Sequence, residues 1–172
     1  MRVWKIKAGE RSKHWRKFVN QQIAAIGAGE EGDLYGYPNE KEFLERTKNY
    51  SQSNKGKKKN NLANNETWNL YSNVQIGDLL LLYGQGKILA LGYITGKYDY
   101  YDCFRWEGEK YFHRRAAKWK IIDASKQNIS PRLKKNLNKF ETNLQEINEK
   151  EDLLEILNLA TNQLFNTTIM QD

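Results

Sequence analysis

The chain has 172 residues, with 28 Lys and Arg against 21 Asp and Glu, two His, one Cys and a formal net charge of +7 at pH 7. This is the length of one domain. A lone cysteine excludes an intrachain disulfide and a cysteine-based zinc site, and no apolar run approaches the ~18 residues of a membrane helix. The charged, amphipathic start is unlike a signal peptide. We therefore expect a cytoplasmic domain of mixed α and β structure.

The charge is unevenly distributed along the chain. Residues 1–139 hold 27 Lys and Arg against 14 Asp and Glu, a net charge of +13, whereas residues 140–172 hold one Lys and seven acids, a net charge of −6. A basic surface of this kind favours a polyanionic partner, because each neutralised phosphate releases condensed counterions. Ordinary surface charge is the alternative, since charge alone indicates nonspecific association and not a fold.

The N-terminal segment predicts a strand followed by a helix. Residues 2–8 alternate apolar and basic side chains, as a strand does. Ser12 is expected to cap a helix whose apolar residues recur at helical spacing as far as Ile26, with Gly27 as its C-terminal stop. Residues 28–38, with three glycines and a proline, predict a loop.

The next segment predicts helices on either side of a basic loop. Asn39 followed by Glu42 makes a capping box, which indicates a short helix to about Tyr50. Residues 51–61 contain four lysines and no apolar residue, as a solvated loop does. Apolar residues between positions 62 and 71 indicate another helical stretch.

The clearest element is an almost wholly apolar strand over residues 76–83, which suits burial on both faces. A glycine-rich turn at residues 84–87 joins it to a strand over residues 88–95, so we expect a hairpin. After a Tyr-rich stretch, residues 111–122 predict another strand. From Pro131 onward, the apolar spacing predicts two amphipathic helices with acids on their outer face.

Candidate catalytic groups are few. His14 in a basic helix and His113 in a strand are isolated, and such histidines are more often packing or surface residues than catalysts. Cys103 lies among aromatic residues, where a small buried hydrophobe is the default, and the spacing of these residues fits no zinc pattern. The turn at residues 84–87 lacks the spacing of a phosphate-binding loop. We therefore expect no catalytic residue, no metal site and no cofactor.

Aromatic and basic side chains interleave in three places, at residues 13–17, 97–106 and 111–120. Flat side chains stack on a nucleobase while neighbouring cations hold the phosphates, which suits an unstacked or flipped nucleotide. Any single aromatic is more often part of the core. Trp15 and Trp106, which are flanked by charge or loop, are the candidates for base binding.

Several short motifs follow one another in an informative order. After a strand containing Trp come Ile-Gly and Gly-Asp-Leu within residues 26–34, Ile-Gly-Asp at residues 76–78, LGYITGKY at residues 91–98, and Arg-x-x-x-Trp at residues 115–119. This order resembles the EVE and YTH-like branch of the PUA superfamily over roughly residues 2–123. In particular, it is similar to the N-terminal DNA-recognition domain of McrB-type modification-dependent restriction GTPases.

The resemblance implies an α+β fold, with a curved mixed β-sheet or open barrel of PUA-like type surrounded by helices and followed by a C-terminal helical extension. A nucleic-acid-binding domain would span residues 1–125, and residues 126–172 would form an acidic helical extension or linker to a following domain. The resemblance also implies a pocket that accepts a modified base flipped from the duplex. In YTH-like members this pocket is an aromatic cage around N6-methyladenine.

The resemblance also suggests residue roles. The family usually has Trp directly after Ile-Gly, where this chain has Ala28. One wall of the cage must then come from elsewhere, such as Trp15, Tyr35 or Tyr37, or the pocket must be more open or accept a different base. Trp106 corresponds best to the second cage aromatic. The expected pocket residues are Trp15, Ala28, Asp33, Leu34, Tyr35, Tyr37 and Trp106. The expected contacts to the nucleic-acid backbone are Lys13, Arg16, Lys57, Lys58, Lys59, Arg105, Arg114 and Arg115.

We therefore expect a non-catalytic module that binds double-stranded DNA, recognises N6-methyladenine or a modified cytosine by flipping it, and targets a McrBC-like restriction complex. A McrC-like nuclease would be a partner through a downstream GTPase domain. Two alternatives stay open. One is an RNA-binding PUA-like module for structured or modified RNA, and the other is a small enzyme or small-ligand regulator that uses the same pocket.

Overall fold

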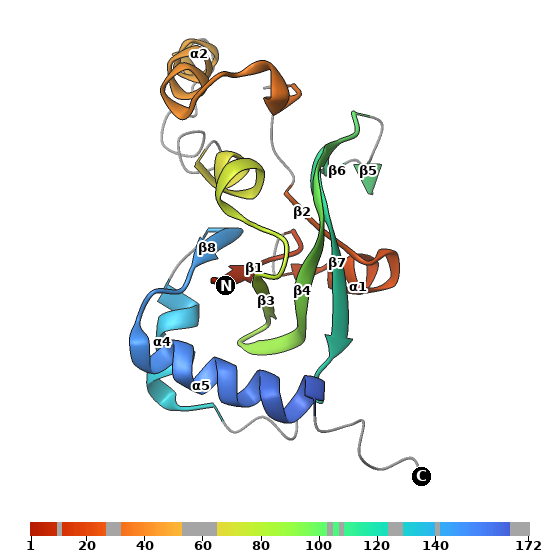
Figure 1. The fold of residues 1–172 in the computed structure, drawn as a ribbon, viewed down its shortest axis with the longest axis vertical. Helices are drawn as coiled ribbons and strands as arrows, with labels where there is room; N and C mark the ends of the chain where they lie inside the picture. Colours follow the sequence, from red (N-terminus) through yellow and green to blue (C-terminus); the bar gives the residue numbers. More distant parts are fainter. Residues whose placement is uncertain are drawn as a thin grey trace.

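The computed structural model describes residues 1–9, 12–26, 32–52, 65–102, 105–106, 109–123, 129–139 and 142–165. Six strands form one twisted, mixed sheet in the order β2-β7-β4-β3-β1-β8 (Figure 1). Its strands are β1 Val3–Ile6, β2 Ile23–Ile26, β3 Leu79–Gly84, β4 Lys87–Tyr100, β7 His113–Ile121 and β8 Leu144–Glu146. β1 and β3 are parallel, and the other neighbours are antiparallel.

Helices surround this sheet, and a small ladder lies beside it. The helices are α1 Trp15–Gln21, α2 Glu40–Gln52, α4 Pro131–Lys139 and α5 Lys150–Ala160, with a 3-10 turn η2 Leu34–Gly36 and π-helical turns η3 Asn69–Asn73 and η5 Thr161–Phe165. The ladder pairs β5 Arg105–Trp106 with β6 Glu109–Lys110. The expected α+β class with a curved mixed sheet is confirmed. No helix in these described segments is long and apolar enough to cross a membrane.

At β3 the sheet is buried on both faces, as the apolar run of this strand predicts. Leu80 and Leu82 join the core that contains Trp4 and residues of α1. Leu79 and Leu81 join a second core that α4 and α5 complete from the other face. A continuous apolar run suits a strand with side chains covered on both sides, so β3 lies near the centre of the sheet.

The predicted β3–β4 hairpin is present. Its two turn residues, Gln85 and Gly86, both have positive φ angles, 55° and 74°. Two consecutive residues of this conformation make the turn whose twist matches that of paired strands. β4 then runs to Tyr100, further than the expected end near residue 95, because its second half pairs with the start of β7.

The first helix is shorter than expected. Gln22 adopts a left-handed conformation, and its N–H bonds to the carbonyls of Phe18 and Val19, which ends α1 at Gln21. Residues 23–26 then form β2, paired antiparallel with the start of β7. Helical spacing does not reveal this change, because a helix and a strand that follow one another can both bury apolar side chains at these positions.

Ser12 does not cap the helix. It has a φ of 58°, and its hydroxyl donates to the Tyr83 carbonyl at 2.6 Å. His14 occupies the cap position without a side-chain hydrogen bond to the helix. By contrast, the predicted cap of α2 is confirmed, since the Asn39 side chain accepts from the Glu42 N–H at 3.0 Å.

The chain beyond residue 125 contributes to the same sheet and core. β8, which the sequence does not predict, pairs antiparallel with β1. Ile156 and Ala160 of α5 pack in one cluster with Val3 and Leu81. Figure 1 shows α5 crossing the view below β3 and β4, with α4 next to its left end. This segment therefore completes one face of the sheet.

Candidate functional site

Three tyrosines from three separate segments meet at one surface. Tyr35 comes from η2, Tyr71 from η3 and Tyr98 from β4. Their ring centroids lie 5.0–5.6 Å apart, and every pair meets edge to face. The Tyr35 hydroxyl donates to the Tyr98 carbonyl at 3.1 Å. Tyr98 is 5% exposed and Tyr35 is 61% exposed, so the Tyr35 ring faces solvent while the Tyr98 ring that it contacts is buried.

A buried aromatic cluster supports this triad. Trp68 stacks on Phe43 of α2, with centroids 5.3 Å apart, and meets Tyr71 edge to face. Tyr37 meets Phe43 at 5.2 Å. Rings that contact each other on several sides have little freedom to rotate. The cluster therefore holds η2, α2 and η3 together behind the tyrosine surface.

The triad forms part of the wall of a pocket of about 480 Å³. The pocket also contains polar and charged groups from η3, from the turn that follows it and from β4. Its lining residues are Tyr35, Tyr71, Ser72, Gln75, Ile76, Lys97, Tyr98 and Arg115. This volume lies within the range of small-molecule pockets, and a mainly apolar wall with a few polar groups is their usual chemistry.

Arg115 lines this pocket and connects η3 to the sheet through hydrogen bonds. Its guanidinium donates to the carbonyls of Leu70 and Tyr71, both at 2.6 Å, and to that of Gly96 at 3.3 Å. Arg115 is only 5% exposed. Burial lowers the pKa of Arg115, while nearby Tyr35, Asp78 and Tyr98 raise it. Arg115 therefore positions the Tyr71 ring, and its guanidinium is engaged by backbone carbonyls.

A buried hydrogen-bonded chain attaches η2 to the sheet. The Tyr98 hydroxyl lies 2.7 Å from His113 Nδ1 and accepts from the Leu34 N–H at 3.5 Å. Burial lowers the pKa of His113 to about 4 and raises that of Tyr98 above its usual range. Both side chains are therefore neutral at pH 7, and a single hydrogen bond joins the Tyr98 hydroxyl to His113 Nδ1.

Four of the seven residues expected to form the pocket lie in or next to η2, and of these four only Tyr35 lines the pocket. Leu34 and Tyr37 belong to the aromatic cluster, and Tyr35 belongs to the triad. Asp33 caps η2 by accepting from the Tyr35 N–H at 3.1 Å. These residues are adjacent because η2 is a single tight turn that lies against β4.

Three expected pocket residues are not part of this group. Trp15, the first residue of α1, packs against the core, with the Arg16 guanidinium carbon 5.2 Å from its ring centroid. Its place in the core explains why it is absent from the tyrosine pocket. Ala28 and the side chain of Trp106 lie outside the described residues, although the Trp106 backbone forms part of β5.

The expected phosphate contacts are spread over the molecule. Lys13 and Arg16 are exposed beside the start of α1. Arg114 forms an ion pair with Asp99 at 2.6 Å and lies over the Tyr101 ring at 4.8 Å. Lys57, Lys58, Lys59 and the Arg105 side chain lie outside the described residues.

The sequence did not single out Tyr71, Lys97 and Tyr98 as pocket residues. Alternation along β4 gives a signal for Tyr98, since it shares the inward face with Ile94. Tyr71 offers no such signal, because its position depends on a π-helical turn held by Arg115. In the segments that the structure describes, no group of three or more His, Cys, Asp or Glu could hold a metal ion.

The sequence matches one family model, described as Domain of unknown function (DUF8426), over residues 4–145. A comparison with curated proteins returns no match. Among solved structures, the chain is similar to the YTH domain of Zygosaccharomyces rouxii MRB1 protein in complex with N6-methyladenosine RNA. That similarity has a TM-score of 0.43 and 16% identity, and it covers 92% of this chain and 85% of that one.

Two further structures show similarity of the same order. The Pho92 YTH domain in complex with m6A has a TM-score of 0.45 and 18% identity, with 92% of this chain and 82% of that one covered. Protein Atu2648 from Agrobacterium tumefaciens has a TM-score of 0.37 and 14% identity, with 92% of each chain covered.

Proposed function

The chain belongs to the DUF8426 family, and we propose that it is a nucleic-acid-binding module that takes up one unpaired base in the tyrosine pocket. The observation that carries this proposal is the exposed Tyr35 ring, held on the half-buried Tyr71 and the buried Tyr98 at the edge of a cavity of about 480 Å³. Aromatic rings held in this way are platforms on which bases stack.

The geometry favours stacking on one ring face. The three tyrosines touch one another edge to face, so the base stacks on Tyr35 and does not enter a slot between parallel rings. Lys97 is exposed at the pocket and supplies a cation for a neighbouring phosphate. Ser72 and Gln75 supply polar groups for the edge of the base.

RNA is the substrate class that we favour. Sequence-specific recognition of RNA usually targets unpaired bases, which stack on aromatic side chains. A base in duplex DNA must first be unstacked and unpaired, at a cost of a few kcal/mol. An open tyrosine platform suits a base that is already unpaired.

N6-methyladenine is the modified base to test first, because the motif order resembles the YTH-like branch. Moving a methyl group from water onto aromatic surface contributes about 0.8 kcal/mol. This free energy corresponds to about a four-fold preference for the methylated base over adenine. Positive charge over residues 1–139 adds affinity that does not depend on the base.

Fluorescence anisotropy with labelled oligonucleotides at physiological salt tests the proposal. The set comprises single-stranded RNA with adenine or N6-methyladenine at one position, the same sequences as single-stranded DNA, and duplex DNA carrying N6-methyladenine or 5-methylcytosine. We expect the methylated single-stranded RNA to bind most tightly. Equal affinity for all of these would refute base recognition.

The same oligonucleotide set tests recognition of modified duplex DNA. Tightest binding to the modified duplex would refute the preference for RNA. It would favour base flipping and the targeting of a McrBC-like restriction complex instead.

A further inference from the structure

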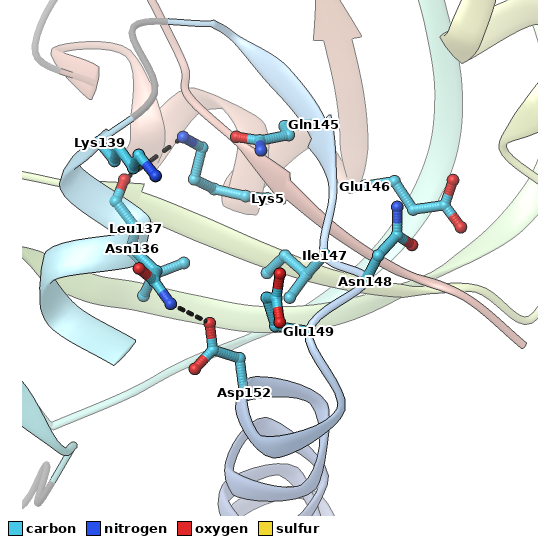
Figure 2. Close-up of a pocket in the computed structure, with 10 residues that line it drawn as sticks. All are labelled: Lys5, Asn136, Leu137, Lys139, Gln145, Glu146, Ile147, Asn148, Glu149 and Asp152. Carbon is cyan, nitrogen blue, oxygen red and sulfur yellow. Dashed lines mark hydrogen bonds between the residues drawn. The ribbon is translucent and has the colours of Figure 1, made fainter. Parts of the chain in front are cut away.

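A second cavity, of about 250 Å³, lies where β1 and β8 meet the ends of α4 and α5 (Figure 2). It lies on the sheet face that α4 and α5 cover, away from the residues of the tyrosine pocket. With about 30 Å³ for each water in the liquid, it has room for about eight waters. This size suits a metabolite of amino-acid dimensions.

One end of the cavity is basic. Lys5 and Lys139 gather there in Figure 2, and the Lys5 ammonium donates to the Leu137 carbonyl at 3.3 Å. Lys5 is 1% exposed, although its neighbours in β1 are apolar. A buried ammonium is costly unless anions or acceptors surround it. Glu66 partly offsets its charge, yet burial and Lys7 lower the pKa of Lys5 to about 8.

A neutral acceptor lies beside this ammonium. Gln145 is the partner of Lys5 across the β1–β8 pair, so the two side chains line the same cavity. In the described structure the Gln145 Oε1 atom is buried and has no hydrogen-bond partner. A buried acceptor without a donor in the protein calls for a donor on a bound molecule.

The other end of the cavity is acidic. Asp152 is 2% exposed, and Arg132 Nε at 3.1 Å and Asn136 Nδ2 at 2.8 Å hold its carboxylate in place. Glu149 is exposed at the same end. Figure 2 shows Leu137 and Ile147 between the basic and acidic ends. The cavity therefore changes from positive to negative along an apolar wall.

We propose that this cavity binds a free α-amino acid with a basic side chain, such as arginine or lysine. The adjacent carboxylate and ammonium of an α-amino acid match the adjacent Lys5 donor and Gln145 acceptor. The methylene chain lies along the apolar wall, and the cationic tip reaches Glu149 and Asp152. Lys139 adds a second cation near the carboxylate.

Thermal unfolding and calorimetry with L-arginine and L-lysine test this proposal. A ligand at a hundred times its Kd raises the Tm of a chain of this size by about 5–10 °C. Agmatine lacks the carboxylate and L-norleucine lacks the cationic tip, so both should shift the Tm less. The proposal would be overturned if neither L-arginine nor L-lysine raised the Tm. It would also be overturned if agmatine and L-norleucine raised the Tm as much as the basic amino acids do.

Two variants separate binding from folding. Lys5→Met keeps the side-chain volume and removes the ammonium, and Gln145→Leu removes the orphaned acceptor. Each should weaken binding of L-arginine by at least about ten-fold, as expected for the loss of one charge-assisted hydrogen bond. Tyr35→Ala, in the other pocket, is the matched control and should leave this affinity unchanged. Undiminished binding in both folded variants would overturn the proposal.

The number of protons taken up when L-arginine binds tests the proposal on the wild-type protein. Near pH 8 a carboxylate bound to Lys5 favours its charged form, so L-arginine binding should take up protons. Calorimetry in two buffers of different ionisation enthalpy measures this uptake. Its absence would overturn the contact between the carboxylate and Lys5.

Discussion

Replacing Tyr35 with alanine should weaken base binding while leaving the fold intact. Tyr35 is 61% exposed, and its side chain makes two edge-to-face contacts and a hydrogen bond from its hydroxyl to the Tyr98 carbonyl. The substitution removes the exposed stacking face without opening the core. Leu34, the neighbouring residue of η2, stays buried and bonded to the Tyr98 hydroxyl.

Tyr35→Ala should lower both the free energy of base binding and the free energy of unfolding, but only the loss of binding should impair function. A base–aromatic stack contributes about 1–3 kcal/mol, so Kd should rise about 5- to 150-fold. The lost edge-to-face contacts and hydrogen bond each contribute about 0.5–1.5 kcal/mol at most, and exposure reduces these values. The free energy of unfolding should therefore fall by about 1–3 kcal/mol, within the 5–15 kcal/mol usual for a domain.

Anisotropy with the methylated RNA, together with urea unfolding, measures both quantities. Tyr35→Phe keeps the ring and should bind nearly as the wild type does, since only the hydroxyl contact is lost. Tyr93→Ala is the matched control, because Tyr93 is an exposed tyrosine of β4 outside the pocket. If folded Tyr35→Ala binds as tightly as Tyr93→Ala, Tyr35 is not the stacking platform.

A pH series and substitutions at His113, Arg115 and Gly92 test the contacts that hold the sheet and the tyrosine pocket together. Because His113 has a pKa of about 4 in the folded chain and about 6.5 unfolded, stability present above pH 6.5 should fall by up to about 3 kcal/mol as pH drops to 4. Urea unfolding across this range should show a smaller decrease for His113→Gln. Arg115→Lys should cost about 2–3 kcal/mol in the same assay and weaken RNA binding, because one ammonium cannot replace three donors in a planar fork. Gly92→Ala places a Cβ against the Lys118 carbonyl and 2.6 Å from the Trp119 ring, so it should lower the free energy of unfolding by about 1–3 kcal/mol, measured by thermal unfolding. A Tm equal to that of the wild type would contradict the close approach of these strands.

The residues expected to bind the base were predictable only in part. Asp33, Leu34 and Tyr35 are consecutive, so placing one of them places all three near the site. Tyr71 and Arg115 are separated by 44 residues, and their contact exists only after η3 docks on β7. No sequence pattern within a short segment predicts a contact between residues so far apart in the chain. The tertiary structure alone therefore shows which tyrosines surround Tyr35.

Local geometry determined some elements before any folding contact was considered. Gln85 and Gly86 can adopt the paired positive φ angles of a tight hairpin, and Asn39 can cap the helix that follows it. The apolar run of β3 required a strand covered on both faces. These features depend on dihedral preferences, adjacent hydrogen-bond partners and side-chain hydrophobicity, all of which are properties of a short segment.

Strand pairing determined the rest. Residues 23–26 have apolar spacing that fits a helix, yet they form β2 because β7 offers unpaired backbone groups at that edge. Residues 144–146 join β1 for the same reason and place Gln145 beside Lys5. The sequence by itself determined the β3–β4 turn, the start of α2 and the buried strand β3. Only the tertiary structure decided the edge strands and the two pockets, because partners distant in the chain supply their hydrogen bonds and walls.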